Sequence, residues 1–345
     1  MARQNGIVLI GSTLVDELIP VLGPGELTYV DANRFVPDSE LKGEKISFSV
    51  GGMALNVAVN LAKIGGRYPV AVCGRVGRDH RARLIRSILR QHDIDDTMLV
   101  EDSEFESSWT EVLNLRLAGG ELERVFRHTL GAMGRFNGAD IPFDRLSAFR
   151  IALCGYGLLL PSLDLEDAEF GTALGRVLAE IKQRGVRTAI DFVSPGPENL
   201  FKFRRYRRAL SWVDICCIND DQARALTDEP SAEKACRILV AEMDVGLAVI
   251  HCGAEGPNYG YDAESGLCVQ PNYRVEPEHY KGNAGAGDAF SAGLLHGLHQ
   301  AWSLGESMRF AAAAAAVSLG DVSCTGAMRN QREIQRFMER TPYRS

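Results

Sequence analysis

The feature that most restricts the fold of this chain is a repeated alternation of short apolar runs with segments of helical periodicity. The apolar runs are rich in Val and Ile and end in Gly, Asp or Asn, which is typical of βα units on a largely parallel sheet. Strands of this kind are predicted at residues 7–10, 70–73, 151–154, 187–192, 213–218 and 247–252. Helices are predicted at about 52–64, 80–92, 168–184, 231–243, 285–300 and 306–319. We therefore expect an α/β fold with helices on both faces of the sheet.

Residues 109–128 break this alternation. Two runs with a period of two, at 109–117 and 121–128, are joined by Ala118-Gly119-Gly120, which is typical of a β-hairpin. With the loop-rich stretch at about 14–50, the hairpin could form a small sheet that covers an active site as a lid. No repeat or Pro-rich linker divides the chain. We expect a single domain over residues 1–345, with the lid formed from about 14–50 and 105–130.

The composition is that of an ordinary globular protein, because 46% hydrophobic residues are enough to fill a sizeable core. A formal net charge of −7 argues against a sequence-independent grip on nucleic acid. The basic cluster at 202–208 is interleaved with apolar residues and is interpreted as the solvated face of a short helix. The eight cysteines have no zinc-site spacing and fit buried thiols in a reducing cytosol. The alanine run at 311–316 is too short to span a membrane, so a cytoplasmic location is expected.

The most specific motif is the glycine-rich run at 281–291, Lys-Gly-Asn-Ala-Gly-Ala-Gly-Asp-Ala-Phe-Ser, which leads into an apolar helical pattern. Glycines at a helix start leave amides uncovered, and these amides with the helix dipole attract anions such as a phosphoryl group. Asp288, in the first turn, could take the proton from an acceptor hydroxyl. We expect the dipole and the amides to lower the pKa of Asp288. The alternative is a plain glycine turn in which Asp288 only stabilises the helix, by about half a kcal/mol.

A second glycine-led helix start, Gly51-Gly52-Met53-Ala54-Leu55-Asn56, has the features of an acceptor site. Glycine lets a small polyol approach the backbone, and the Asn56 amide can both donate to and accept from hydroxyls. Asp16 follows the first predicted strand and offers a carboxylate to two hydroxyls. Each residue also has a structural explanation: Gly51 and Gly52 as a turn, Asn56 as an exposed helix residue, and Asp16 as a loop acid.

Together, these two motifs resemble the ribokinase family of carbohydrate kinases, also called the phosphofructokinase-B family. The resemblance extends over nearly the whole chain and includes residues 11–16, 74–79, 127–132, the strand end at Asn219 and residues 251–256. It implies a three-layer α/β/α fold with a central, mainly parallel sheet and a small β lid. It also implies a sugar kinase that uses ATP and Mg²⁺.

The resemblance implies a role for each matching residue. The sugar would be held under the lid by Asp16, Gly51, Gly52 and Asn56. ATP would lie across the ends of the later strands, near Asn219, His251, Gly253 and Gly256. His251 replaces a common Thr there and could equally be a core residue. The amides of Gly285, Ala286 and Gly287 would form an anion hole, and Asp288 would be the general base.

The sequence departs from the family pattern close to the predicted phosphate site. Gly282 and Asn283 stand where the family usually has Asp and Thr, and that acid binds a monovalent cation in many members. Activation by a monovalent cation is therefore doubtful. Gln222 stands where the family usually has a Glu that organises metal-bound water, and its amide carries no charge. Asp220 or Asp221 could supply that charge from a shifted position, so we assign no residue as a metal ligand.

The leading hypothesis is transfer of the γ-phosphoryl group of ATP to a hydroxyl of a small sugar, which could resemble ribose, fructose or ketodeoxygluconate, under a lid that excludes water. A nucleoside kinase of the same family would need an aromatic wall, for which Phe105, Trp109 and Phe126 are candidates. A sugar-binding regulatory protein with weakened catalysis is a third hypothesis, motivated by the departures from the family pattern.

Two properties of the lid have alternative explanations. Arg116, Arg124 and Arg127 could recognise an acidic sugar, because guanidinium pairs well with carboxylate, or could simply keep a strand face soluble. Edge-to-edge pairing of two lid hairpins could also form a homodimer. The expected partners are a small sugar and ATP, with no nucleic acid and no membrane.

Overall fold

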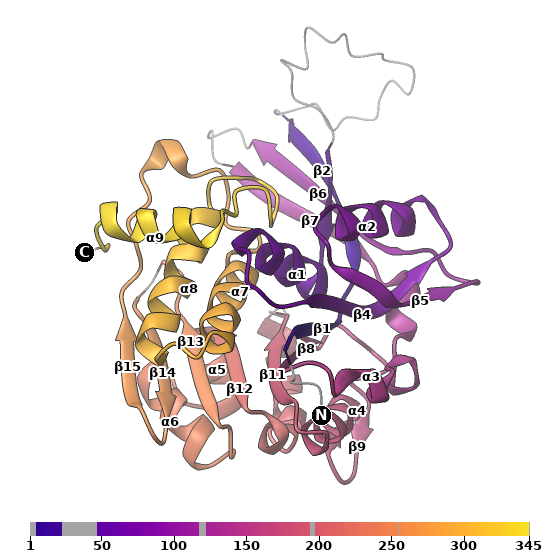
Figure 1. The fold of residues 1–345 in the computed structure, drawn as a ribbon. Coiled ribbons are helices and arrows are strands. Elements are labelled where there is room, and N and C mark those ends of the chain that lie inside the picture. The colour runs from indigo at the N-terminus through magenta and orange to yellow at the C-terminus, as the bar shows by residue number, and fades with distance from the viewer. Residues whose placement is uncertain (1–4, 23–46, 117–121, 194–196, 255, 345) are drawn as a thin grey trace, which may run out of the picture.

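A nine-stranded sheet forms the centre of the computed structural model, which describes residues 5–22, 47–116, 122–193, 197–254 and 256–344 (Figure 1). The order of the strands is β15-β14-β13-β12-β11-β8-β1-β4-β5. Their bounds are β1 Ile7–Gly11, β4 Val70–Gly77, β5 Asp95–Asp102, β8 Ile151–Gly157, β11 Arg187–Phe192, β12 Ile215–Asn219, β13 Leu247–His251, β14 Asn258–Asp262 and β15 Gly266–Gln270. Seven strands, from β13 to β5 in this order, run parallel, and at the other edge the pairings β13–β14 and β14–β15 are antiparallel. The predicted, mainly parallel sheet is confirmed.

Strand β1 lies next to the point where the winding of the chain reverses. The chain passes from β1 to β4 and β5 on one side, then returns to β8 and continues to β13 on the other. In open parallel sheets, ligands bind outside the carboxyl ends of the strands at such a switch point. The ends of β1 and β8 pair Gly11 with Gly155, so a binding site is expected beside these two glycines.

Helices pack on both faces of the sheet and complete three layers (Figure 1). One face is covered by α1 (Met53–Ile64), α2 (His80–Gln91), α7 (Ala286–His299), α8 (Leu304–Ser318) and α9 (Gln331–Arg340). The other is covered by α3 (Phe143–Leu146), α4 (Ala173–Gln183), α5 (Asp220–Thr227) and α6 (Ala232–Ala241). The side chains of residues 7–10 in β1 are fully buried, as expected for a strand between two helical layers.

A four-stranded sheet stands off the central one and forms the lid (Figure 1). Its order is β3-β2-β6-β7, with bounds Ser47–Gly51, Leu14–Leu22, Ser108–Arg116 and Leu122–Thr129. Strands β6 and β7 pair antiparallel, so the predicted hairpin is confirmed; its turn, 118–120, lies outside the described residues. Strand β2 leaves β1 after only two residues and β3 leads directly into α1, so the lid is attached at the switch point.

Several elements differ from the sequence-based expectation. Strand β5 was not predicted, because its three aspartates and one glutamate lower strand propensity; it lies at the sheet edge, where charges are tolerated. Helices α5 and α9 and the antiparallel edge strands were also not predicted. The basic cluster at 202–208 was expected on the solvated face of a short helix, and it overlaps the 3₁₀ helix Pro197–Tyr206, which buries Phe203 and Tyr206. Among the described residues, no helix is both long and apolar enough to cross a membrane.

Candidate active site

A cavity of about 230 Å³ lies between the lid and the carboxyl ends of the central strands. Its floor carries polar side chains from three elements of the main fold: Asn56 of α1, Tyr156 of β8 and Asp288 of α7. Gly52, at the start of α1, and Gly285, at the start of α7, also line it. The two glycine-led helix starts that the sequence singled out therefore face one space.

The lid contributes one row of polar side chains to the cavity. Asp16 of β2 is the register partner of Thr110 in β6, and Thr110 is the partner of His128 in β7. All three line the cavity, and Thr110 Oγ1 lies 2.9 Å from His128 Nδ1. Because side chains at matched positions of adjacent strands point to the same face, these three form a continuous line across the lid.

Asp288 is held by hydrogen bonds to both carboxylate oxygens. Asn56 Nδ2 donates to Oδ2 at 2.8 Å, and the Tyr156 hydroxyl donates to Oδ1 at 2.5 Å. The carboxylate is only 3% exposed. Gly285, the residue that caps α7, has φ of 73°, and a Cβ there would lie 2.4 Å from the Cβ of Cys324, so this turn requires glycine. The motif therefore fixes the entry of the chain into α7 and with it the place of Asp288.

The amides of the predicted anion hole are not all equivalent. The Ala286 amide donates to the carbonyl of Asn283 at 3.2 Å and is engaged in the turn. Gly287 and Asp288 lie in the first helical turn, where amides have no acceptor within the helix. Among these residues, the Gly287 and Asp288 amides are therefore candidates for binding an anion at this helix start.

The expectation that the pKa of Asp288 is lowered is wrong. Burial raises the pKa of Asp288, and the hydrogen bonds from Tyr156 and Asn56 offset this only in part. Burial and the nearby charge of Asp288 raise the pKa of Asp16 to about 7. Burial and Asp288 also raise the pKa of Asp191, at the end of β11, well above its usual range. For Asp288, burial thus outweighs the helix dipole, and the charge of Asp288 in turn disfavours the charged forms of Asp16 and Asp191.

The two acceptor-side glycines have different roles. A Cβ at Gly51 would lie 2.5 Å from the Asp16 carboxylate, so this glycine makes room for Asp16 rather than lining the cavity itself. Gly52 lines the cavity with φ of 82°, and a Cβ there would lie 2.7 Å from the Ser12 carbonyl. The Ser12 hydroxyl accepts from the Met53 amide and completes the start of α1. Both glycines are required by close packing around the acceptor side.

Asn56 carries an unsatisfied polar atom in this site. Its Nδ2 is bonded to Asp288, whereas its Oδ1 is buried and has no hydrogen-bond partner among the described residues. Leaving a buried acceptor unpaired costs about 1–3 kcal/mol, so such atoms normally have a partner. A hydroxyl of a bound molecule is a suitable donor, because it could satisfy Oδ1 without displacing the bond to Asp288.

The residues expected to bind the nucleotide lie outside this cavity, at or after the ends of the neighbouring strands. Asn219 ends β12 and is the register partner of His251 at the end of β13. The Asn219 side chain accepts from the Gln222 amide at 2.8 Å, and the Asn219 amide donates to Gln222 Oε1 at 2.9 Å. Gln222 Nε2 also donates to the Phe192 carbonyl at 2.7 Å. Asn219 and Gln222 thus form a capping box that ties α5 to β11.

His251, one of the residues expected to bind the nucleotide, packs against the start of α7. A Cβ at Gly287 would lie 3.4 Å from His251 Cε1, and the His251 ring lies 5.4 Å from that of Phe290. Burial lowers the pKa of His251 to about 4, so its imidazole is neutral at pH 7. The carbonyls of Gly253 and Gly256 both accept from Asn272 Nδ2, at 2.5 and 2.7 Å. Asn219 and His251 thus end adjacent strands, and Gly253 and Gly256 lie in the loop that follows β13.

Some residues of the site were not found by sequence reasoning. Tyr156 lies just after the predicted strand 151–154 and Asp191 near the end of the predicted strand 187–192, and their position at the carboxyl ends of parallel strands was the available signal. Thr110, His128 and Cys324 line the cavity without any local motif. The thiol of Cys324 lies 3.9 Å from Asp16 Oδ2.

Of the lid residues considered for binding an acidic sugar or a nucleobase, the three with described side chains, Arg127, Phe105 and Trp109, do not line this cavity. Arg127 is exposed, forms an ion pair with Glu111 at 2.9 Å and lies over the Trp109 ring. Phe105 is exposed and is covered by Arg135. The side chains of Arg116, Arg124 and Phe126 lie outside the described residues. Phe105 and Trp109 therefore provide no aromatic wall for a nucleobase in the described cavity.

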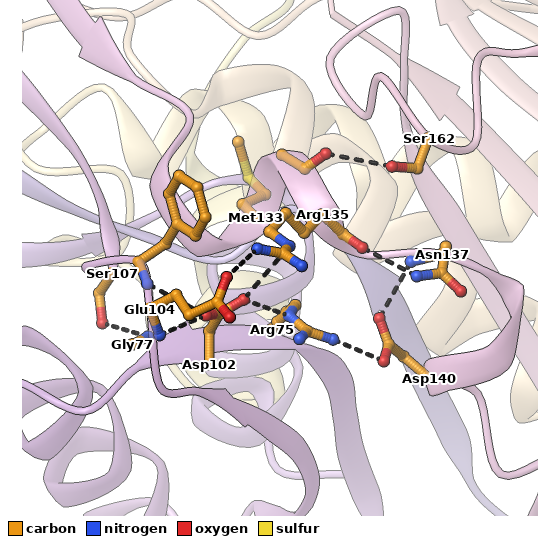
Figure 2. Close-up of polar contacts among 12 residues, drawn as sticks. Arg75, Gly77, Asp102, Glu104, Ser107, Met133, Arg135, Asn137, Asp140 and Ser162 are labelled. Carbon is orange, nitrogen blue, oxygen red and sulfur yellow. Dashed lines mark hydrogen bonds and ion pairs between the residues drawn. The ribbon is translucent and has the colours of Figure 1, made fainter.

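A polar network anchors the segment that follows the lid hairpin (Figure 2). Arg75, near the end of β4, donates to Asp102 Oδ2 at 2.9 Å and to Asp140 Oδ1 at 2.7 Å. Arg135 forms a further ion pair with Asp102 at 3.8 Å. Met133 lies in the same 3₁₀ turn as Arg135, Gly131–Arg135, and lines the cavity. The network thereby fixes this part of the cavity wall to the main sheet.

Comparison with known proteins identifies the family. The sequence model described as "pfkB family carbohydrate kinase" matches residues 16–331. This chain belongs to the pfkB family of carbohydrate kinases. It is therefore a phosphotransferase that acts on a sugar hydroxyl, and the resemblance that the motifs indicated is confirmed.

Three curated relatives of this pfkB family member differ in the sugar in their names. A ribokinase of Haemophilus influenzae is 25% identical, over 88% of this chain and 92% of the relative. Fructokinase-1 of Oryza sativa subsp. japonica is 27% identical, over 98% of each chain. A 5-dehydro-2-deoxygluconokinase of Geobacillus thermodenitrificans is 22% identical, over 86% of each. The names of these relatives do not agree on one acceptor.

Solved structures confirm the fold of this pfkB kinase. Arabidopsis thaliana ribokinase, complexed with ribose and ATP, has a TM-score of 0.72 at 19% identity, covering 97% of this chain and 99% of the other. An Escherichia coli protein provisionally described as ribokinase II, in complex with ATP and Mg²⁺, has a TM-score of 0.75 at 15% identity, with the same coverage. The expected three-layer ribokinase-like fold with a small β lid is confirmed.

Proposed function

We propose that this protein transfers the γ-phosphoryl group of ATP to a hydroxyl of a small sugar, with Asp288 as the general base. The observation that carries the proposal is the place of Asp288: it lies on the floor of one cavity with Asp16 and Asn56, at a helix start that attracts phosphate. A base, hydroxyl-binding groups and exposed amides then face the same space. The names of the ribokinase and fructokinase relatives support a small sugar as acceptor.

In the proposed reaction, the acceptor hydroxyl gives its proton to Asp288 while its oxygen attacks the γ-phosphorus and ADP leaves. A raised pKa makes Asp288 a stronger base than an ordinary carboxylate, which favours this proton transfer. Asp16 and the free Oδ1 of Asn56 would accept hydrogen bonds from other hydroxyls of the sugar. The amides at the start of α7 would stabilise charge on the transferring group.

The residues on the nucleotide side fit ATP with its Mg²⁺. A Cβ at Gly253 would meet no described atom within 4 Å, which leaves room for a ligand there. Among the described residues, no three His, Cys, Asp or Glu side chains are grouped to hold a metal by themselves. Mg²⁺ bound to ATP needs only one or two protein carboxylates, and it would neutralise phosphate charge. Asp221 is paired with Arg224, so we assign this role to Asp220.

An ADP-release assay over ribose, fructose, ketodeoxygluconate, inosine and adenosine tests the proposal. Each acceptor is measured with ATP and Mg²⁺, with and without K⁺. We expect release that depends on a sugar and exceeds the rate without acceptor. Release that depends on a nucleoside would favour the nucleoside kinase. Release with no acceptor-dependent increase would contradict the proposal.

A sugar-binding protein with weakened transfer is the second candidate. The observation that favours it is Gln222, whose uncharged amide is committed to Asn219 and Phe192 where the family usually has an acid. Isothermal titration separates the two candidates, because both bind a sugar but only the kinase couples binding to ADP release. Tight sugar binding without release would favour the regulatory protein.

A further inference from the structure

The lining of the cavity narrows the class of acceptor. We propose that the acceptor is an uncharged, partly deoxygenated polyol that places a face of hydrogens or alkyl groups against the lid, rather than a sugar acid or a fully hydroxylated sugar. This inference rests on the function proposed above and concerns the same cavity.

The charges around the cavity argue against an acidic acceptor. Asp16 and Asp288 both line the cavity, and Asp191 lies close enough to interact with Asp288. Among the residues that the structure describes, no Lys or Arg lines it. A carboxylate on the acceptor would enter a desolvated space already occupied by acidic groups, with no cation to pair with it. Like charges brought together under such conditions strongly oppose binding.

The pattern along the lid strands places an apolar row beside the polar one. Leu14, Asp16 and Leu18 alternate along β2 and line the cavity together, because every second residue of a strand points to the same face. Leu18 is the register partner of Val112 in β6, which also lines the cavity. The row next to Asp16 and Thr110 is therefore apolar in both strands.

The apolar wall continues where the hairpin rejoins the main fold. Leu130 and Met133 line the cavity, and Leu159, Val193 and Val322 complete its sides. The turn that carries Met133 is joined to both sheets: its Arg135 pairs with Asp102 of β5, and the Met133 amide donates to Ser108 Oγ of β6 at 3.2 Å (Figure 2). A hydroxyl directed at this wall would lose its hydrogen bonds to water without gaining a partner.

The remaining polar groups define where hydroxyls are accepted. They form the floor, with Asn56, Tyr156 and Asp288, and one line across the lid, with Asp16, Thr110 and His128. Thr129, which follows His128 in β7, and Cys324 also line the cavity. An acceptor with hydroxyls on one side and hydrogens or alkyl groups on the other would satisfy both surfaces. A fully hydroxylated sugar would complement only the polar surface, because some of its hydroxyls would face the apolar wall.

Two matched comparisons test the inference by isothermal titration without ATP. Ribitol and ribonate are both open chains and differ in one charged end; we expect ribonate to bind at least about 10²-fold more weakly. Ribose is compared with 2-deoxyribose and 3-deoxyribose; we expect at least one deoxy sugar to bind about tenfold more tightly than ribose. Equal or tighter binding of ribonate, or of ribose over both deoxy sugars, would overturn the inference, as would failure of the whole set to bind.

A variant at Val112 tests whether the apolar side chains of the lid cause the preference for a deoxy sugar. Val112→Thr keeps the shape of the side chain and adds one hydroxyl to the apolar row, so the preference for the deoxy sugar is expected to fall towards a ratio of one. Val269→Thr makes the same change at an exposed position of β15 and should leave the ratio unchanged. A ratio that survives in Val112→Thr would contradict the assignment, and the wild-type comparison decides the inference if that variant does not fold.

Sugar binding and phosphoryl transfer are measured in separate experiments, so the proposed acceptor class and the proposed kinase activity can be contradicted independently. The same sugars are assayed for ADP release with ATP and Mg²⁺. Release with ribonate preferred would leave the kinase proposal intact and overturn the acceptor class. A preference for uncharged, deoxygenated sugars in binding, with no release for any of them, would support the acceptor class and contradict the proposed kinase.

Discussion

The Tyr156 hydroxyl donates a 2.5 Å hydrogen bond to Oδ1 of Asp288, and these residues are 132 positions apart in the sequence. Burial raises the pKa of Tyr156 well above its ordinary value, and the charges of Asp288 and Asp191 raise it further. Tyr156 therefore stays protonated and remains a donor. Because a hydrogen bond to the charged form of an acid favours that form, Tyr156 lowers the pKa of Asp288 against the effect of burial.

Replacing Tyr156 with Phe is expected to shift the pH dependence of kcat. The ring remains but the donor is lost, so the pKa of Asp288 rises and the base is available only at higher pH. We expect the acid side of the pH profile to move upward by about one unit, because a hydrogen bond to a charged group is worth about 1.5–3 kcal/mol. Steady-state kinetics between pH 5 and pH 9 measure this.

Tyr280→Phe is the matched control, because Tyr280 is exposed and removing its hydroxyl should not change the profile. A Tyr156→Phe enzyme with lower kcat and an unshifted profile would assign Tyr156 to packing alone. The shift in pH dependence is therefore the decisive measurement, rather than the rate at one pH.

Asp288→Asn is expected to lower kcat by at least about 10²-fold, the low end for loss of a positioned general base. The amide keeps the size of the side chain and can still contact Asn56 and Tyr156, so sugar binding should change less than turnover. Isothermal titration of sugar binding, together with steady-state kinetics, separates a loss of sugar affinity from a loss of turnover. Near-normal turnover would remove Asp288 from the chemical step.

Asp16 is expected to make acceptor binding depend on pH. Burial and the proximity of Asp288 raise its pKa to about 7, so its carboxylate gains charge as the pH rises from 6 to 8. A charged carboxylate accepts hydroxyl hydrogen bonds more strongly than a neutral carboxyl, so KM for the acceptor should fall over this interval. Asp16→Asn should raise KM at pH 8 by about tenfold and flatten its pH dependence. An unchanged slope in the variant would assign the titration to another group.

The sequence predicted the parts of this site that rest on local pattern. The two glycine-led helix starts and the period-two hairpin depend on residues close together in the chain, so Asp288, Asn56, Gly52 and the lid were identified before their contacts were known. The family resemblance, rather than a local pattern, placed Asp16 in the same site as these residues. The roles of Gly51 and Gly285 in close packing needed the structure, because the atoms they approach belong to distant segments.

The pKa of Asp288 could not be derived from its helix position alone. The local terms, the dipole and the amides, favour the charged form, but burial depends on the whole fold and acts in the opposite direction. Tyr156 and Asp191 reach the site because parallel strands end at one edge, which requires the strand order β11-β8-β1. That order is a property of tertiary structure, and a single sequence does not specify it locally.

Gln222→Glu restores the acid usual in the family, yet it is expected to destabilise this protein. Gln222 is buried, and its Nε2 donates to the Phe192 carbonyl; a carboxylate cannot donate, so that carbonyl loses its partner and a charge is buried. We expect the free energy of unfolding to fall by about 1–3 kcal/mol, measured by urea denaturation. Gln183→Glu, at an exposed position of α4, is the control. Equal stability with higher turnover would instead show that an acid is useful here.

His299 is expected to make stability fall as the pH falls. It lies in α7 with its ring 4.1 Å from that of Tyr68, it is 6% exposed, and neither ring nitrogen has a hydrogen-bond partner among the described residues. Burial lowers its pKa to about 4, below the value near 6.5 of an exposed histidine. The unfolded chain therefore binds a proton between these pH values while the folded protein does not. The resulting contribution to stability is complete above pH 6.5 and is lost as the pH falls towards 4.

His299→Phe removes this titration and keeps an aromatic ring against Tyr68. We expect the variant to gain stability relative to the wild type, and to gain more at pH 5 than at pH 8, as measured by urea denaturation at both values. His279→Phe, at an exposed position, should show no such difference between the two pH values. Since Asp16 and Asp288 also titrate in the folded protein, the comparison is made between variants at each pH, where their contributions cancel. A gain of equal size at both pH values would mean that the Phe ring acts by packing alone.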